Sequence, residues 1–300
     1  MEIRALRYFL TVAREESVTK AAEFLHISQP TLSRQIMELE EELGKKLFRR
    51  HSHSVRLTEA GLLLRERAKD ILDMADKTEK EFKSLDDFSG GDIYIGCAES
   101  EGMACLIQAA VNLRQRYPRV RFHFYSSGTD AVAERLDKGL LDIAVIVQPV
   151  DLIRYNYLTI PHTDRWGLLM KKGDSLAQKE SVCLEDIRSL PLICSRQGWE
   201  KDLLGWFGES RESVNIVATY DMLYNASLMV REGLGYAIGL ESLIYTGAES
   251  ELCFRPLEPS VPSPLYIIWK KHQIFTPAAH LLIREARSVF RLLHSPDAHS

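Results

Sequence analysis

Ser17-Val-Thr-Lys-Ala-Ala-Glu-Phe-Leu-His-Ile-Ser-Gln-Pro-Thr-Leu-Ser-Arg-Gln-Ile-Met-Glu-Leu-Glu40 is the stretch that decides the fold of the first part of the chain. Ser17 and Ser28 each stand where a helix should begin, because a serine hydroxyl can accept a hydrogen bond from the unpaired amides of a first helical turn. Apolar residues then recur at spacings of four, three and four, at Leu32, Ile36, Leu39 and Leu43. This spacing commits one side of the second helix to a core. We therefore expect two short helices joined by a tight turn.

The other side of the second helix carries groups suited to reading DNA. Hydroxyls, an amide and a guanidinium gather near its beginning, at Gln29, Pro30, Thr31, Ser33 and Arg34. Such groups on a short helix can contact base edges in the major groove. An amphipathic helical hairpin is also a common packing unit with a solvated outer face, so this pattern alone leaves both interpretations open.

The segment that follows, residues 43–58, is basic. It contains Lys45, Lys46, Arg49, Arg50 and Arg56 with two histidines, and no acidic residue lies between Glu42 and Glu59. A basic wing beside a helical hairpin is suited to phosphate contacts, which we expect Arg50 and Arg56 to make. The wing therefore favours DNA binding over a merely packed hairpin.

These residues resemble the DNA-binding segment of the LysR-type transcriptional regulators. The resemblance rests on Ser28-Gln-Pro-Thr-Leu-Ser-Arg-Gln-Ile36, Leu39-Glu40, Leu43-Gly44, Leu47-Phe-Arg-Arg50 and Leu57-Thr-Glu-Ala-Gly61. It implies a winged helix-turn-helix that binds double-stranded promoter DNA at an imperfect inverted repeat, with RNA polymerase as a further partner. His53 stands where members more often have arginine, and it is kept as a candidate DNA contact.

A long helix capped by Thr58 is expected next. A seven-residue repeat runs through Leu57, Leu64, Ile71, Thr78 and Leu85, with Gly61, Ala68, Ala75 and Phe82 four residues after the first four. This is the a/d pattern of a two-chain coiled coil, although a long helix packed on its own domain would show a similar stripe. We expect residues 58–87 to dimerise the chain and residues 88–91 to form a flexible hinge. The family resemblance implies that dimers pair further into a tetramer.

Strands and helices alternate from Asp92 onward. Strands are expected at residues 93–98, 120–126 and 141–147, and helices at 103–117 and 129–138. A second group begins with residues 165–170 and contains a helix and a strand within 184–193, a helix at 222–232 and a strand at 235–239. The chain closes with a strand at 265–269 and a helix at 277–293. This order predicts mostly parallel sheets in two lobes, with a cleft at the carboxyl ends of the strands.

Residues 128–144 and 230–235 resemble parts of the LysR-type effector domain, which is similar to periplasmic binding proteins. The family pattern places four polar residues at the cleft, Ser100, Thr129, Ser195 and Asp221. The segments around Ser100 and Thr129 follow expected strands and open expected helices, so their hydroxyls and amides would converge and favour an anion.

The charge of this small-molecule effector stays open. Acidic residues lie in or beside the same segments, at Glu99, Glu101, Asp130 and Asp221. If they face the cleft they would repel an anion and suit an amine or a neutral ligand. They could equally stabilise the starts of their own helices.

Composition describes a globular chain of 300 residues, 45% of them apolar, with a net charge of −4. The absence of a basic-then-apolar N-terminal segment and of a long apolar run disfavours secretion and membrane insertion, so we expect a cytoplasmic protein. Five scattered cysteines without metal-site spacing indicate reduced thiols. Cys194 is either a buried inert thiol or a redox switch.

No catalytic motif of hydrolases, phosphate-binding loops or metalloproteases is present, so we expect no enzyme, no cofactor and no metal. The alternative is a solute-binding or enzymatic α/β domain fused to a regulatory DNA-binding module. The expected fold class is α/β with an all-α N-terminus. Its parts are a winged helix-turn-helix (1–57), a linker helix (58–87), a hinge (88–91) and a two-lobed effector domain (92–300). Lobe I should comprise about 92–161 and 266–300, and lobe II about 162–265.

Overall fold

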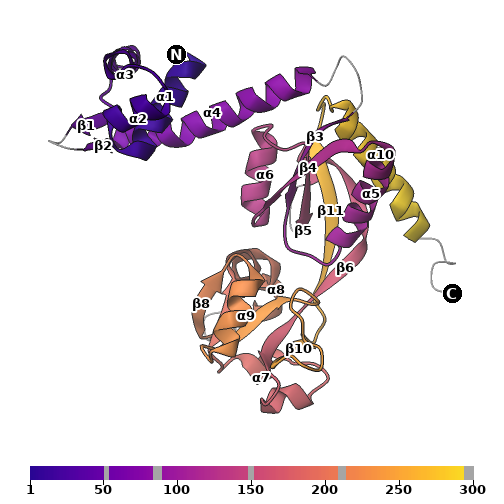
Figure 1. The fold of residues 1–300 in the computed structure, drawn as a ribbon. Coiled ribbons are helices and arrows are strands. Elements are labelled where there is room, and N and C mark those ends of the chain that lie inside the picture. Colours follow the sequence, from indigo (N-terminus) through magenta and orange to yellow (C-terminus); the bar gives the residue numbers. More distant parts are fainter. Residues whose placement is uncertain (51–53, 84–89, 148–151, 209–213, 294–300) are drawn as a thin grey trace. The chain divides into compact units, whose positions relative to one another are not determined.

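A computed structural model of the chain describes residues 1–50, 54–83, 90–147, 152–208 and 214–293 (Figure 1). The contacts within the chain divide it into two units, Met1–Lys83 and Ser84–Ser300. Each unit is described by itself.

The first unit is a winged helix-turn-helix. Its elements are α1 (Ile3–Glu15), α2 (Val18–Phe24), α3 (Gln29–Leu43), β1 (Phe48–Arg50), β2 (Val55–Leu57) and α4 (Glu59–Lys83). The expected caps are present: Ser17 Oγ accepts from Lys20 N, and Ser28 Oγ accepts from Thr31 N at 3.3 Å. Phe9 and Leu32 are fully buried in the core that α1, α2 and α3 share.

The first half of α4 packs against the core of its own unit. Ala68 is fully buried there, and Leu64 is packed against the same cluster. A side chain on Gly61 would place its Cβ 2.2 Å from the carbonyl oxygen of Leu47, so only glycine allows the helix this close. The first heptad positions therefore pack within the chain itself. For this half of α4, the alternative of a helix packed on its own domain is correct. Farther along, Ile71 and Phe82 are exposed.

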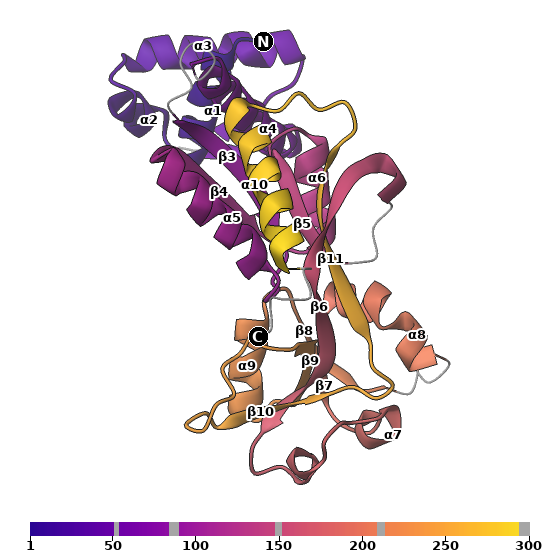
Figure 2. The same ribbon diagram turned by 90° about the vertical axis from the view of Figure 1, so that its right-hand side faces the viewer.

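The second unit is built on a nine-stranded sheet. Its strands pair in the order β4-β3-β5-β11-β6-β9-β7-β8, and β10 pairs with β6. The strands are β3 (Gly90–Cys97), β4 (Arg119–Ser126), β5 (Ile143–Val147), β6 (Tyr155–Lys171), β7 (Leu192–Ser195), β8 (Ile216–Tyr220), β9 (Tyr236–Leu240), β10 (Leu252–Pro256) and β11 (Pro262–Lys270). β3 pairs parallel with β4 and β5, and β7 pairs parallel with β8 and β9. The antiparallel strands β6 and β11 run through both lobes (Figure 2).

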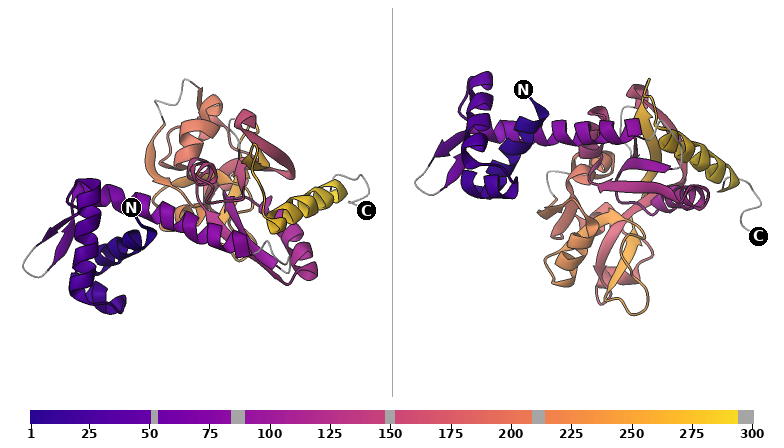
Figure 3. Two further views of the ribbon diagram at one scale, coloured as in Figure 1. Left: turned by 90° about the horizontal axis from the view of Figure 1, so that it is seen from above. Right: turned by 45° about the horizontal axis from the view of Figure 1, so that its top comes forward.

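Helices cover both faces of the sheet in lobe I, as Figure 3 shows. They are α5 (Met103–Arg116), α6 (Thr129–Asp137) and α10 (Pro277–Leu293), while lobe II carries α7 (Leu184–Ile187), α8 (Leu204–Phe207) and α9 (Leu223–Arg231). Short turns of helix lie at η1 (Leu152–Arg154), η2 (Ser175–Gln178) and η3 (Gly198–Asp202). Alternate residues of β5 enter opposite layers: Val145 packs with α5 and α10, and Ile146 packs with α6. The two-lobed α/β fold is confirmed.

Several details differ from the expectations. The strands β6, β8 and β10 were not among the expected strands. Gly90 and Gly91 belong to β3 and pair with Arg119 and Val120, and a Cβ on Gly90 would lie 2.5 Å from Arg119 Cβ. Both glycines therefore lie in a paired strand rather than in a hinge, and Gly90 permits the close approach of β4. The rest of the expected hinge, residues 88–89, and the heptad position Leu85 lie outside the described residues.

Within the described residues, none of the helices is long and apolar enough to cross a membrane.

Candidate functional site

The first turns of α3 present a polar surface. Gln29, Pro30, Thr31 and Arg34 are exposed and Ser33 is half-buried, whereas Leu32 and Ile36 on the opposite side are buried. The 3.6-residue period produces this division between core and surface. All five candidate base-contacting residues thus lie on the side of the helix that faces away from the buried Leu32 and Ile36.

Hydrogen bonds hold several of these side chains in place. Gln29 Nε2 donates to Ser33 Oγ at 2.8 Å, and Arg34 Nε donates to Glu38 Oε1 at 2.8 Å. The Arg34 side chain is still 79% exposed, so its guanidinium can leave this surface ion pair at little cost. Thr31 Oγ1 lies 2.7 Å from Ser28 Oγ, which ties the hydroxyl of Thr31 to the helix cap.

The wing presents two arginines directly opposite each other. Arg49 on β1 is the register partner of Arg56 on β2, both are exposed, and neither has a carboxylate partner among the described residues. Like charges at opposed positions of a strand pair are unfavourable unless an anion lies between them. Arg49 was not among the expected contacts. The side chain of Arg50 and the whole of His53 lie outside the described residues.

A buried carboxylate joins the wing to α3, and the sequence analysis missed it. Glu40 Oε1 accepts from Leu47 N at 2.8 Å and from Phe48 N at 3.2 Å, and Lys46 Nζ donates to Glu40 Oε2 at 2.7 Å. Burial by itself would raise the pKa of Glu40, but the hydrogen bonds from Lys46 and from the two amides lower it overall. Glu40 therefore stays ionised and fixes the start of β1 against the helix.

The second unit contains a cavity between its lobes, at the carboxyl ends of β3, β5, β7 and β8. Its volume is about 90 Å³. Lobe I contributes Ala98, Glu99, Ser127, Gly128 and Val147, and lobe II contributes Trp166, Ser195, Arg196, Gln197, Tyr220, Asp221, Met222, Leu223, Leu240 and Leu243. This is the expected position of a ligand site in an α/β sheet.

The structure brings two of the four expected effector residues to the cavity. Ser195 and Asp221 line it. Thr129 is buried beside it and its hydroxyl faces the carbonyl of Val147 at 3.5 Å. Ser100 is buried and its hydroxyl accepts from Gly102 N at 2.9 Å. The hydroxyls of Ser100 and Thr129 do not converge on the cavity, in contrast to the expectation.

Three polar contacts cross from one lobe to the other around the cavity. Glu99 Oε2 accepts from Leu223 N at 2.7 Å, and Gln197 Oε1 accepts from Thr129 N at 3.0 Å. Lys201 Nζ pairs with Asp130 at 2.6 Å. The partners of Glu99 and Gln197 are distant in the sequence, so no local pattern could have indicated either residue.

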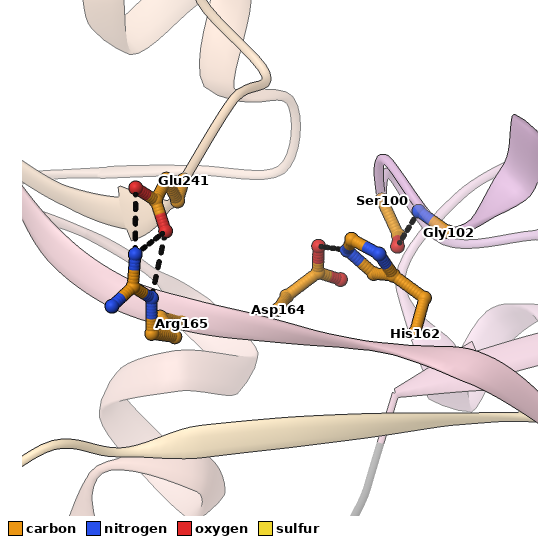
Figure 4. A network of polar contacts seen from close by, with 6 residues as sticks. All are labelled: Ser100, Gly102, His162, Asp164, Arg165 and Glu241. Carbon is orange, nitrogen blue, oxygen red and sulfur yellow. Dashed lines mark hydrogen bonds and ion pairs between the residues drawn. The ribbon is translucent and has the colours of Figure 1, made fainter. Parts of the chain in front are cut away.

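A buried carboxylate lies where β6 passes between the lobes (Figure 4). Asp164 Oδ1 is 3.1 Å from His162 Nε2, and the side chain of Asp164 is almost completely buried. Burial raises the pKa of Asp164, while contacts with Ser100 and His162 counteract the rise only in part. Next to it, Arg165 Nε donates to Glu241 Oε2 at 2.9 Å. Ser100 therefore belongs to the crossover between the lobes rather than to the cavity lining.

Cys194 is fully buried on β7, and burial raises the pKa of its thiol to about 12. A thiol in this state is not the reactive thiolate. In the described part of the chain, no group of three or more His, Cys, Asp or Glu residues could hold a metal ion.

Comparisons with known proteins agree with this architecture. Residues 3–62 match the family described as bacterial regulatory helix-turn-helix protein, lysR family, and residues 87–291 match the LysR substrate binding domain. The chain is 30% identical to an uncharacterized HTH-type transcriptional regulator, YwbI, of Bacillus subtilis, over 96% of each chain. It is 28% identical to the Hca operon transcriptional activator HcaR of Escherichia coli, over 91% of this chain and 93% of the other.

A solved structure shares the fold over nearly all of the chain. This is full-length CbnR complexed with its target DNA, which is 20% identical and has a TM-score of 0.74, with 96% of this chain and 100% of that chain covered. The matches to both family descriptions span the DNA-binding segment and the two-lobed unit. The chain therefore belongs to the LysR family of transcriptional regulators, with a DNA-binding helix-turn-helix and an effector-binding domain.

Proposed function

We propose that the first unit binds duplex DNA with α3 in the major groove, through Gln29, Pro30, Thr31, Ser33 and Arg34. The observation that carries this proposal is the exposed polar side of α3 beside a wing whose opposed arginines, Arg49 and Arg56, lack a carboxylate partner among the described residues. Side chains on the helix would read base edges, and the wing would contact phosphates. Arg50 and His53 stay proposed contacts from the sequence alone.

The experiment compares Arg34→Ala with Arg287→Ala on DNA from upstream of the chain's own reading frame. Arg287 is an exposed arginine of α10 in the other unit, so its removal changes the net charge equally. Arg34→Ala should lose about 1 to 3 kcal/mol of binding free energy and discriminate less between target and altered sequences. Arg287→Ala should bind as the unmodified chain does. An Arg34→Ala variant with unchanged affinity and sequence choice would refute this role for α3.

We propose further that a small-molecule effector binds in the cavity between the lobes, next to Ser195 and Asp221. Ser100 and Thr129 would affect the effector only indirectly. Ser100 would act through the part of β6 that passes between the lobes, and Thr129 would act through the start of α6. An effector changes the DNA-bound state only if it binds two conformations of the chain with unequal affinity. A true effector should therefore change both the thermal stability and the DNA footprint.

The assembly is proposed to be a homodimer or homotetramer on an imperfect inverted repeat. The exposed residues Ile71 and Phe82 on the second half of α4 could form the dimer contact, which would extend over residues 58–87. We also infer that the protein acts in the cytoplasm, where the DNA is, and that it contacts RNA polymerase. Its role is inferred to be regulatory rather than enzymatic. Relatives that are transcriptional regulators support this last inference.

A further inference from the structure

Two helices that begin at the cavity are capped across it by side chains of the opposite lobe. α6 begins at Thr129 and α9 begins at Leu223, and neither receives a side-chain cap from the residue before it. Gln197 of lobe II accepts from the amide of Thr129, and Glu99 of lobe I accepts from the amide of Leu223. The first amides of both helices, which attract acceptors, are thus already occupied by the chain itself.

The charges around the cavity are mainly negative. Glu99 and Asp221 both line it, against one basic lining residue, the exposed Arg196. The ammonium of Lys201, which lies in η3, is paired with Asp130. A ligand that enters the cavity therefore meets two carboxylates, one of them already bound at the start of α9.

We propose that Glu99 sets the specificity of this site by serving as a built-in anion: its carboxylate occupies the acceptor position at the start of α9 and excludes effectors that carry a carboxylate or phosphate there. The effector is then a neutral or cationic molecule that donates hydrogen bonds. This inference rests on the proposed function, because it concerns the ligand class of the same cavity.

The position of the Glu99 carboxylate accounts for the exclusion. Glu99 lines the cavity and its carboxylate already accepts from Leu223 N, so an anion that approached this amide would meet a like charge and be repelled. A donor group, by contrast, can compete with Leu223 N for the Glu99 carboxylate. Such competition would weaken one of the contacts between the lobes and couple ligand binding to their relative position.

The test uses the full chain and acetate as the probe. Glu99→Ala removes the internal carboxylate and frees the amide of Leu223, so acetate should bind in its place. At ten times its dissociation constant, acetate should raise the melting temperature of Glu99→Ala by about 3 to 6 °C. The unmodified chain should show no such rise, with chloride at equal ionic strength as the reference. Glu99→Gln should also show none, because its amide oxygen still fills the position.

Glu101→Ala provides the matched control, since Glu101 is an exposed carboxylate two residues away that does not line the cavity. Saturable stabilisation by acetate of Glu99→Ala alone supports the proposal. Equal stabilisation of the unmodified chain, or no response of Glu99→Ala, overturns it. A mobility-shift assay of the same variants, on DNA from upstream of the reading frame, tests the proposed function separately. If neither the unmodified chain nor any variant binds this DNA, the proposed function is rejected, whatever the response to acetate.

Discussion

Replacing Glu40 by alanine tests whether this carboxylate holds the wing against α3. The change removes the acceptor of two buried amides, Leu47 N and Phe48 N, and a buried amide left without an acceptor costs about 1 to 3 kcal/mol. The contact with Lys46 adds little, because the Lys46 side chain is 75% exposed. We expect a loss of about 2 to 4 kcal/mol, since water can enter the gap and satisfy the amides in part. For a unit of this size the melting temperature should fall by at least about 8 °C.

The pH dependence follows from the direction of the pKa change. The folded-state pKa of Glu40 is lowered from its ordinary value of 4.5, so the ionised form stabilises the fold. This contribution is fully present above about pH 4.5 and is lost as the pH falls through the lower, folded-state pKa. Glu40→Gln keeps one acceptor oxygen but cannot ionise, so its stability should lack this acid-dependent component.

The assay is urea unfolding combined with amide hydrogen exchange at Leu47 and Phe48. Glu41→Ala serves as the control, because Glu41 is an exposed carboxylate on the next position of the same helix and its loss should stay within about 0.5 kcal/mol. Faster exchange at both amides in Glu40→Ala is expected. If Glu40→Ala loses no more stability than Glu41→Ala, the carboxylate does not hold the wing.

Four further outcomes are expected. Gly61→Ala should lose about 1 to 3 kcal/mol in urea unfolding, since its Cβ would meet the carbonyl of Leu47 at 2.2 Å; full stability would contradict this packing. Arg49→Ala should weaken binding to all DNA sequences alike and reduce the salt slope by about one, whereas altered sequence choice would assign it to base contacts. Phe82→Glu should shift the assembly toward monomer in light scattering, and an unchanged mass would remove Phe82 from the interface. Cys194 should resist alkylation in the folded protein because its thiol has a pKa of about 12, so rapid modification seen by mass spectrometry would reverse this expectation.

The parts of the fold that follow from neighbouring residues could be predicted from the sequence. The caps at Ser17 and Ser28 depend on atoms within one helical turn, and the closing helix Pro277–Leu293 has one buried side throughout. β6 could not be predicted over its full length, because it leaves one lobe and enters the other. Its neighbours change along its 17 residues, so its burial follows no single period.

The candidate sites divide in the same way. The exposed side of α3 follows from the helical period, whereas the pairing of Arg49 with Arg56 depends on strand register, which the sequence of the wing does not specify. Glu99 and Gln197 accept from amides 124 and 68 residues away. Such contacts arise only when the two lobes close on each other, so no motif marks them.

The close approach at Gly61 makes α4 a rigid lever. Because its first half is part of the core that also holds α3, the helix cannot turn without turning the recognition surface with it. Its 25 residues extend about 37 Å at 1.5 Å per residue. A tilt of about 5° would therefore move its far end by about 3 Å. A small displacement imposed at the far end is therefore reduced by the time it reaches the residues proposed to contact DNA. In the proposed dimer, such a lever would adjust the angle between the two half-sites.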